Sequence, residues 1–203
     1  MNWRIITGAL LALAASTRCG FAADPRFPDW PCTQAKVPEI SLTAVWAGPS
    51  LDDVQDQWKD DVRMSALVAK LAARRIPLEE AGKDIKDFLA GSSDKVKSGT
   101  LLFSGLFDAL NAQRSSVMRG IERVTRKQRD AAEKIRSDTI DLQRLQGASP
   151  PDQSKIDELN NQLLWEARIF EDRRRMVKYV CEVPTEIDRR LFALGRAIQQ
   201  EME

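Results

Sequence analysis

The chain has 203 residues, of which 43% are hydrophobic and 30% are charged, as is ordinary for a water-soluble helical domain. Thirty-one Lys and Arg residues nearly balance thirty Asp and Glu residues, so bulk attraction to nucleic acid is not expected. The chain has no histidine, which excludes His-dependent catalytic triads, HExxH metal sites and most zinc sites. We therefore predict no enzyme activity, no metal and no cofactor.

Residues 1–23 have the pattern of a secretory signal peptide. Arg4 precedes an apolar run from 5 to 15, and small residues stand before Asp24. Removing this segment takes away Arg4 and Arg18 and no acid, so the net charge changes from +1 to −1. No later segment approaches the ~20 apolar residues of a membrane span. The sequence thus predicts a periplasmic or secreted protein with no membrane span after cleavage.

Signal cleavage leaves two cysteines, Cys32 and Cys181. An even pair in an oxidising compartment is expected to form a disulfide. Two reactive thiols are the alternative, but no CxxC motif and no histidine favours it. The bridge would fasten the front of the chain to a point far along it.

Residues 24–49 are predicted to form an extended N-terminal arm, because proline at high density prevents a helix. Trp30 and Trp46 are expected to bury their rings against the helices, with an exposed recognition surface as the alternative. Five of the chain's nine prolines lie here: Pro25, Pro28, Pro31, Pro38 and Pro49.

Residues 50–203 predict a helical bundle. Ser50 is expected to cap the first helix, which continues to about Arg75. A shorter helix closed by Gly91 follows, then a helix from Lys95 that runs on into a hairpin. A last amphipathic helix follows Pro184. The predicted fold class is all-α, a helical bundle built on a long antiparallel coiled-coil-like hairpin.

The hairpin is predicted over residues 112–180. Both arms carry apolar residues at the alternating spacing of four and three that marks a helix packed on a partner helix. Placing Leu145 opposite Ile156 sets the register and puts Ala131 beside Phe170. Gly147 is expected to be left-handed just past the first arm, before Pro150 and Pro151. The stripes consist of Val117, Ile121, Val124, Ala131, Ile135, Leu142 and Leu145, and of Ile156, Leu159, Leu163, Phe170, Val177 and Val180.

Two polar features interrupt this pattern. Gln128 and Arg173 fall in one layer of the seam, either as a pair that sets the register or as a buried ligand contact. The hairpin end away from the turn is rich in cations that are either a solvated face paired with nearby acids or a patch for an anionic ligand or acidic partner. The candidate patch consists of Arg123, Arg126, Arg174, Arg175 and Lys178.

Two functions are compatible with these patterns. The first is a structural or protein-interaction module of the cell envelope, which acts on an envelope protein not identified by the sequence. The second is a binding or sensor module for an anionic ligand, such as a lipid headgroup or a glycan phosphate, at the basic end of the hairpin. A long apolar seam can also be completed by a second copy, so a homodimer is a further expectation to test.

Overall fold

The fold is all-α in the computed structural model, which describes residues 24–203. The predicted signal peptide lies outside the described residues. Within residues 24–203 every regular element is helical. The elements are α1 (Leu42–Val45), η1 (Asp52–Val54), η2 (Gln57–Lys59), α2 (Val62–Ala72), α3 (Leu78–Ala90), α4 (Lys95–Gln146), α5 (Gln153–Val180) and α6 (Val183–Met202).

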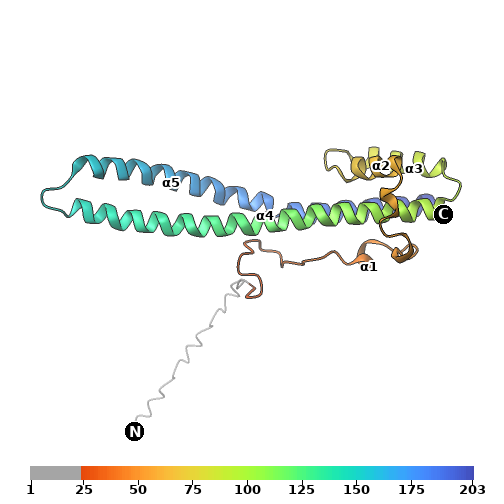
Figure 1. Ribbon diagram of the computed structural model, residues 1–203, viewed down its shortest axis with the longest axis horizontal. Coiled ribbons are helices and arrows are strands. Elements are labelled where there is room, and N and C mark those ends of the chain that lie inside the picture. Colours follow the sequence, from red (N-terminus) through yellow and green to blue (C-terminus); the bar gives the residue numbers. More distant parts are fainter. Residues whose placement is uncertain (1–23) are drawn as a thin grey trace, which may run out of the picture.

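The fold is organised around α4, a single helix of 52 residues (Figure 1). At ~1.5 Å per residue it is about 78 Å long. One half of α4 packs against α6, and the other half packs against α5 and forms the predicted hairpin with it. The prediction that the helix from Lys95 runs unbroken into the hairpin is confirmed.

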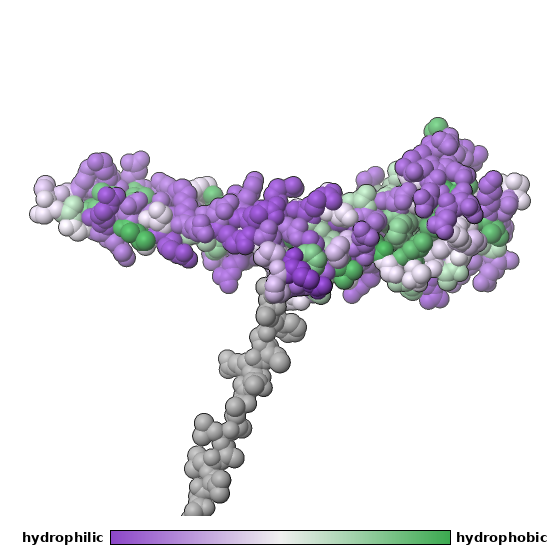
Figure 2. All heavy atoms as spheres, turned by 60° about the horizontal axis from the view of Figure 1, so that its bottom comes forward, coloured by the Kyte–Doolittle hydropathy of each residue, from purple (hydrophilic) through white to green (hydrophobic). Residues whose placement is uncertain are grey.

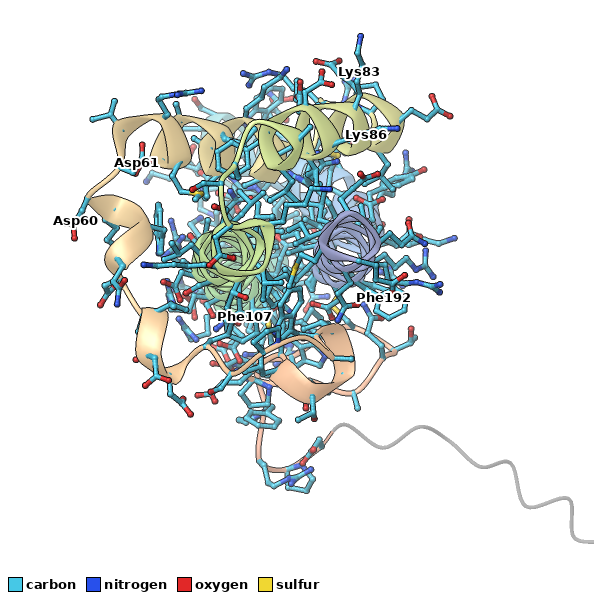
Figure 3. All side chains as sticks on the ribbon, turned by 90° about the vertical axis from the view of Figure 1, so that its right-hand side faces the viewer. Asp60, Asp61, Lys83, Lys86, Phe107 and Phe192 are labelled. Carbon is cyan, nitrogen blue, oxygen red and sulfur yellow. A yellow bond between two sulfur atoms is a disulfide. The ribbon has the colours of Figure 1, made fainter. Side chains whose placement is uncertain are left out.

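The core lies at one end of the molecule and has three layers. Figure 3 looks along the helices and shows α4 and α6 side by side, with α2 and α3 on one side of them and the arm with α1 on the other. The two outer layers enclose Phe103, Leu191 and Ile85, which have almost no exposed surface. The hairpin extends beyond this core.

Close packing in the core depends on glycines at two crossings. A Cβ on Gly105 would lie 2.7 Å from a Val68 side-chain carbon of α2, and one on Gly195 would lie 2.7 Å from the carbonyl oxygen of Val45. Such distances are too short for carbon, so neither position accepts a larger side chain without movement. These glycines let α2 and the arm approach the central helices.

The predicted helix from Ser50 to Arg75 is wrong in its first part. Two 3-10 turns replace it, and α2 begins only at Val62. Asp56 has a φ of 64°, a left-handed conformation that ends the first turn, and the Asp61 carboxylate caps α2 by accepting from the backbone of Arg63 and Met64. Several aspartates in this stretch could each cap a helix N-terminus. The pattern of apolar residues therefore did not show at which residue α2 begins.

The hairpin turn corrects a second prediction. Gly147 has φ −83° and ψ −6°, so it is right-handed, not left-handed. Its amide reaches the carbonyl of Gln143 within the last turn of α4, and Asp152 caps α5. The register of α4 against α5 is within one residue of the predicted one. Lys134 pairs with Glu166 and Asp138 accepts from Gln162, and each of these contacts between the helices is shifted by one residue from the prediction.

The arm is extended, as predicted, apart from the single turn of α1. Trp46 is buried, as expected, and stacks on Phe103 with ring centroids 4.1 Å apart. Its indole nitrogen donates to the carbonyl of Pro49 at 2.8 Å. Trp30 is half-buried and donates to the carbonyl of Gln34. Trp46 therefore holds the arm on α4, whereas the hydrogen bond of Trp30 is internal to the arm.

Candidate functional site

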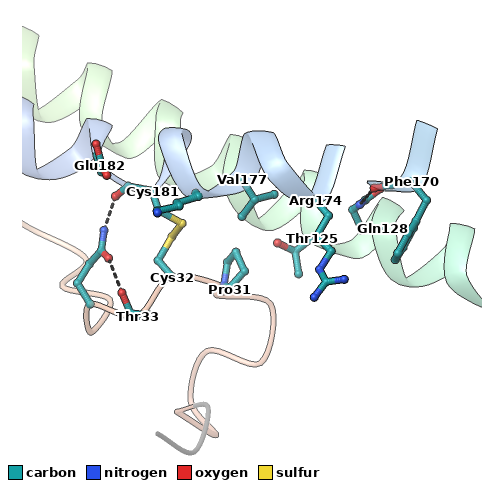
Figure 4. Close-up of a pocket in the computed structure, with 12 residues that line it drawn as sticks. Pro31, Cys32, Thr33, Thr125, Gln128, Phe170, Arg174, Val177, Cys181 and Glu182 are labelled. Carbon is teal, nitrogen blue, oxygen red and sulfur yellow. Dashed lines mark hydrogen bonds between the residues drawn. A yellow bond between two sulfur atoms is a disulfide. The ribbon is translucent and has the colours of Figure 1, made fainter. Parts of the chain in front are cut away.

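The predicted disulfide is present at the base of the hairpin. The sulfurs of Cys32 and Cys181 are 2.02 Å apart and their Cα atoms 5.6 Å apart. Beside the bridge, the Gln34 side-chain amide donates to the backbone carbonyl of Cys181 (Figure 4). The arm is thus fastened to the junction of α5 and α6, where it lies across one face of the hairpin.

Ion pairs hold the arm on this face. Asp29 accepts hydrogen bonds from Arg126, at 2.7 Å, and from Arg129. The hydrogen bond from Arg126 is the main reason that the pKa of Asp29 lies below its usual value, and the hydrogen bond from Arg129 lowers it further. Farther along the arm, Lys36 pairs with Glu122. Asp29 therefore matches two cations of α4 on this side, and Lys36 pairs with an acid of the same helix.

Arg114 joins three elements at the edge of the core. Its guanidinium is buried, donates to the carbonyl of Val37 at 2.7 Å and lies 2.7 Å from the carboxylate of Asp188 in α6. Burial raises the pKa of Asp188 although the Arg114 charge opposes the shift. Arg114 is therefore a structural cation that ties the arm and α6 to α4.

A hollow of about 550 Å³ lies between the arm and the hairpin, next to the disulfide (Figure 4). Its walls are mixed, with Pro31 and Val177 among the apolar groups and Arg174 and Lys178 as cations. Gln128, one of the two polar seam residues, also lines it.

The two polar seam residues separate in the structure. The Gln128 amide donates to the backbone carbonyl of Phe170 at 3.1 Å, across the two helices, while its own carbonyl oxygen is buried without a partner. Arg173 is exposed and lies on the other face of the hairpin. Gln128 therefore makes the contact expected of a register-setting residue, and Arg173 extends to solvent.

The five residues of the predicted basic patch do not converge. Arg126 pairs with Asp29, and Arg174 and Arg175 lie 3.4 and 4.0 Å from acids on their own helix. Arg123 lines a hollow on the face away from the arm, whereas Arg174 and Lys178 line the hollow beside it. The patch is divided between two faces because its residues come from different sides of two helices.

The face of the hairpin away from the arm is mainly apolar, with Arg123, Lys134, Glu166 and Arg173 also on its walls, and no residue of 24–203 outside α4 and α5 lines it. Two hollows of about 490 and 320 Å³ follow it, and only α4 and α5 line them. Trp165 and Met176 are 63% and 62% exposed, and Val124 is 41% exposed. We call this the uncovered face; it comprises Val117, Gly120, Val124, Ala131, Ile135, Trp165, Ile169, Arg173, Met176 and Val180.

Trp165, Ile169 and Met176 were not among the predicted site residues. Their spacing of four and seven residues places them on one side of a helix, beside the seam. This spacing is the feature of the sequence that could have predicted an apolar face there. Seen from the arm side, by contrast, the hairpin is covered mainly by hydrophilic side chains (Figure 2). The two faces of the hairpin therefore differ in chemistry.

Within residues 24–203, no group of three or more Cys, Asp or Glu side chains is arranged to hold a metal ion. None of the helices described there has the length and apolar character needed to cross a membrane.

Comparison of the chain with protein-family models, with curated proteins and with solved structures finds no match in any of the three.

Proposed function

We propose that the protein is an exported helical interaction module of the cell envelope, and that its hairpin presents the uncovered face to another polypeptide chain. The observation that carries the proposal is the row of large apolar side chains on that face. Fully burying a side chain of this size is worth roughly 1.5–3 kcal/mol, so a helical partner that covers Trp165 and Met176 would gain several kcal/mol.

Export is supported by two features. The sequence pattern of residues 1–23 is that of a secretory leader, and the Cys32–Cys181 pair lies at bonding distance. Such a bridge is typical of proteins that fold in an oxidising compartment. A coiled-coil description of the α4–α5 seam belongs to the same proposal, since it would make the hairpin a rigid support for the uncovered face.

A non-enzymatic role is part of the proposal. The chain lacks histidine, and each hollow described above has at most one carboxylate on its wall, Glu182 beside the disulfide and Glu166 on the uncovered face, so none presents two facing carboxylates. Such surfaces suit binding by shape and apolar contact. An activity that needs a general base would have to use a carboxylate or lysine elsewhere.

Crosslinking in cells tests the proposal. A photoreactive amino acid at position 165 should give a product of discrete mass in the envelope fraction, because Trp165 lies on the uncovered face. The same group at Leu164 is the matched control, since this neighbour is 71% exposed but lines neither hollow of that face. Equal yields at the two positions, or no product at position 165, would count against the proposal.

A second candidate function is binding of an anionic ligand at the hairpin base. Arg174 and Lys178 on the wall of the hollow beside the disulfide favour it, and no ion pair is found for Lys178 among residues 24–203. Titration with inorganic phosphate, and with vesicles that contain anionic lipid, should then raise the melting temperature of the protein but not of Lys178→Ala. Equal melting temperatures with and without these anions would exclude this candidate.

A further inference from the structure

We infer that the occupant of the uncovered face is an acidic amphipathic helix of another protein, which lies lengthwise between α4 and α5 as the third helix of a bundle. The inference rests on the proposed interaction function and adds the chemistry of the partner. Two properties of the face support it: its shape and the position of its cations.

The uncovered face is a groove that runs along the hairpin. Its two hollows follow one another between α4 and α5, and both helices contribute to the walls of each. From Val117 to Ile135 the groove is about 27 Å long at ~1.5 Å per residue, the length of a helix of roughly 18 residues. A helix with apolar residues every three or four positions fills such a groove with one stripe, which would contact Val124, Ile169 and Met176.

Two cations in the groove lack a counter-charge. Arg173 lines both hollows and Arg123 lines the larger one, both are exposed, and no ion pair is found for either among residues 24–203. Lys127 lies four residues from Arg123, on the same side of α4. The other charges on the walls, Lys134 and Glu166, pair with each other at 2.8 Å. A helix that covers the face must therefore bring carboxylates, because burying an unpaired charge is costly.

The segments that form the face are basic as a whole. Residues 117–135 and 165–180 contain eleven Lys and Arg against six Asp and Glu. The single charge of Asp29, which pairs with two of these cations, leaves them in excess. A partner rich in acids is therefore attracted before contact and paired on contact. A second copy of this chain would bring the same excess of cations, so the charge favours a different protein.

The position of Arg173 favours a protein helix over a lipid surface. A helix that lies on a membrane keeps its cations on the polar side and buries an apolar face. Here Arg173 lies between Ile169 and Met176 of the apolar face, four and three residues from them along α5. Acyl chains over this guanidinium would leave it without a partner, whereas a helix can place a Glu or Asp opposite it.

Charge reversal in the crosslinking experiment tests the chemistry of the partner. With the photoreactive amino acid at position 165, Arg123→Glu together with Arg173→Glu should lower the yield of the product about tenfold, because two attractions become repulsions. Arg119→Glu together with Arg168→Glu is the matched control, since these exposed residues of the same two helices line neither hollow. The control should leave the yield unchanged. Equal yields from the two double variants would overturn the acidic partner.

Mass spectrometry of the product identifies the segment that position 165 contacts. The expected segment belongs to another protein, has apolar residues at spacings of three and four, and has more acids than cations over about 18 residues. A product of two copies of this chain, or a segment with as many cations as acids, would overturn the inference.

Model helices test the same point on the purified protein, expressed with export so that the disulfide forms. Three labelled peptides of about 18 residues share one apolar stripe and carry Glu, Gln or Lys beside it. Fluorescence anisotropy should show the Glu peptide binding about tenfold more tightly than the Gln peptide, and the Lys peptide most weakly. Equal dissociation constants for the Glu and Gln peptides would contradict the charge selection.

Vesicles of phosphatidylglycerol and phosphatidylcholine test the lipid alternative. The protein should not sediment with them through the uncovered face, so Trp165→Glu should sediment as wild type does. Vesicle binding by wild type that Trp165→Glu abolishes would show that the occupant is a membrane and would overturn the inference.

The two proposals fail differently. A discrete protein product at position 165 that does not depend on Arg123 and Arg173 would overturn the acidic helix and leave the interaction function intact. The absence of any product at position 165 would overturn both.

Discussion

Arg114 shows at the scale of a single residue how this protein uses its cations. It belongs to the cation-rich stretch of the hairpin base, yet it is only 5% exposed and its charge is matched by Asp188 and by backbone carbonyls of the arm. A buried ion pair contributes little net stability compared with apolar packing, but losing one partner leaves the other charge stranded. The structure therefore depends on both members being present.

We expect Arg114→Met to lower the free energy of unfolding by roughly 1–3 kcal/mol, because the carbonyl of Val37 loses its donor and Asp188, whose side chain is 38% exposed, loses its counter-charge. Urea unfolding at pH 7 measures the change. Arg119→Met, at an exposed position of the same helix, is the control and should change stability by less than about 0.5 kcal/mol. Equal changes in the free energy of unfolding for the two variants would show that the contacts of Arg114 do not contribute to stability.

Asp29 gives the docking of the arm a pH dependence. Its pKa in the folded protein lies below the usual 3.8, chiefly because Arg126 donates to it. A depressed pKa adds stability that is fully present above the unfolded value and is lost as the pH falls through the folded value. Asp29→Asn should therefore reduce the loss of stability on going from about pH 5 to pH 2.

Chemical denaturation of both proteins at each pH measures this difference. Arg126→Gln removes the first cause of the shift and should reduce the acid sensitivity in the same direction. If wild type and Asp29→Asn lose stability in parallel, the Asp29 contacts do not hold the arm in solution.

At the scale of the elements, α4 is the spine to which the other parts attach. Its first half is buried between α6, α2 and the arm, whereas its second half has only α5 beside it. The buried half accordingly has buried residues on every side, namely Thr100, Leu102, Phe103, Ser104 and Gly105, and the second half has a narrow apolar stripe. One helix thus serves as a core helix and as one arm of a hairpin.

The close approach of α6 to the arm gives a prediction at this scale. Gly195→Ala would put a Cβ 2.7 Å from the backbone oxygen of Val45, and we expect it to cost about 1–3 kcal/mol of stability. Gly82→Ala in α3 is the matched control, because no atom lies within 4 Å of the added carbon. That change should stabilise the protein by roughly 0.5–1 kcal/mol. Melting temperatures that move in the same direction for both variants would contradict the observed packing.

At the scale of the whole molecule, a core at one end supports a hairpin that extends away from it, and the arm runs along one side of both (Figure 1). The Cys32–Cys181 bridge closes a loop with a sequence separation of 149 residues and connects the arm to the junction of hairpin and core. The arm therefore covers one face of the hairpin base and leaves the opposite face accessible.

Because the bridge closes so long a loop, replacing both Cys32 and Cys181 by Ser should lower the free energy of unfolding by about 5 kcal/mol on the chain-entropy model. Guanidinium unfolding of the double variant and of the wild type measures this. Wild-type protein reduced with dithiothreitol should match the variant. If reduction leaves the unfolding midpoint unchanged, the bridge is either not formed or not stabilising.

The uncovered face and the division of the basic patch belong to this scale as well. Neither is a property of one helix, because each depends on which side of the α4–α5 pair the arm occupies. Arg123 and Arg126 lie three residues apart in α4, yet Arg123 lines the uncovered face and Arg126 pairs with Asp29 of the arm.

The amino-acid sequence alone was enough to predict the all-α class, the hairpin with its register to within one residue, and the pairing of Cys32 with Cys181. These features follow from helical periodicity, from a short proline-containing link and from the presence of only two cysteines after residue 23. The first two are properties of short sequence segments, and the third is a simple count. Tertiary structure alone decided that Arg114 is buried, that Ser50 caps no long helix, and that Trp165 and Met176 lie on a face that the arm does not cover. Those outcomes depend on which distant segments meet, because burial and charge pairing are set by neighbours that the local sequence does not name.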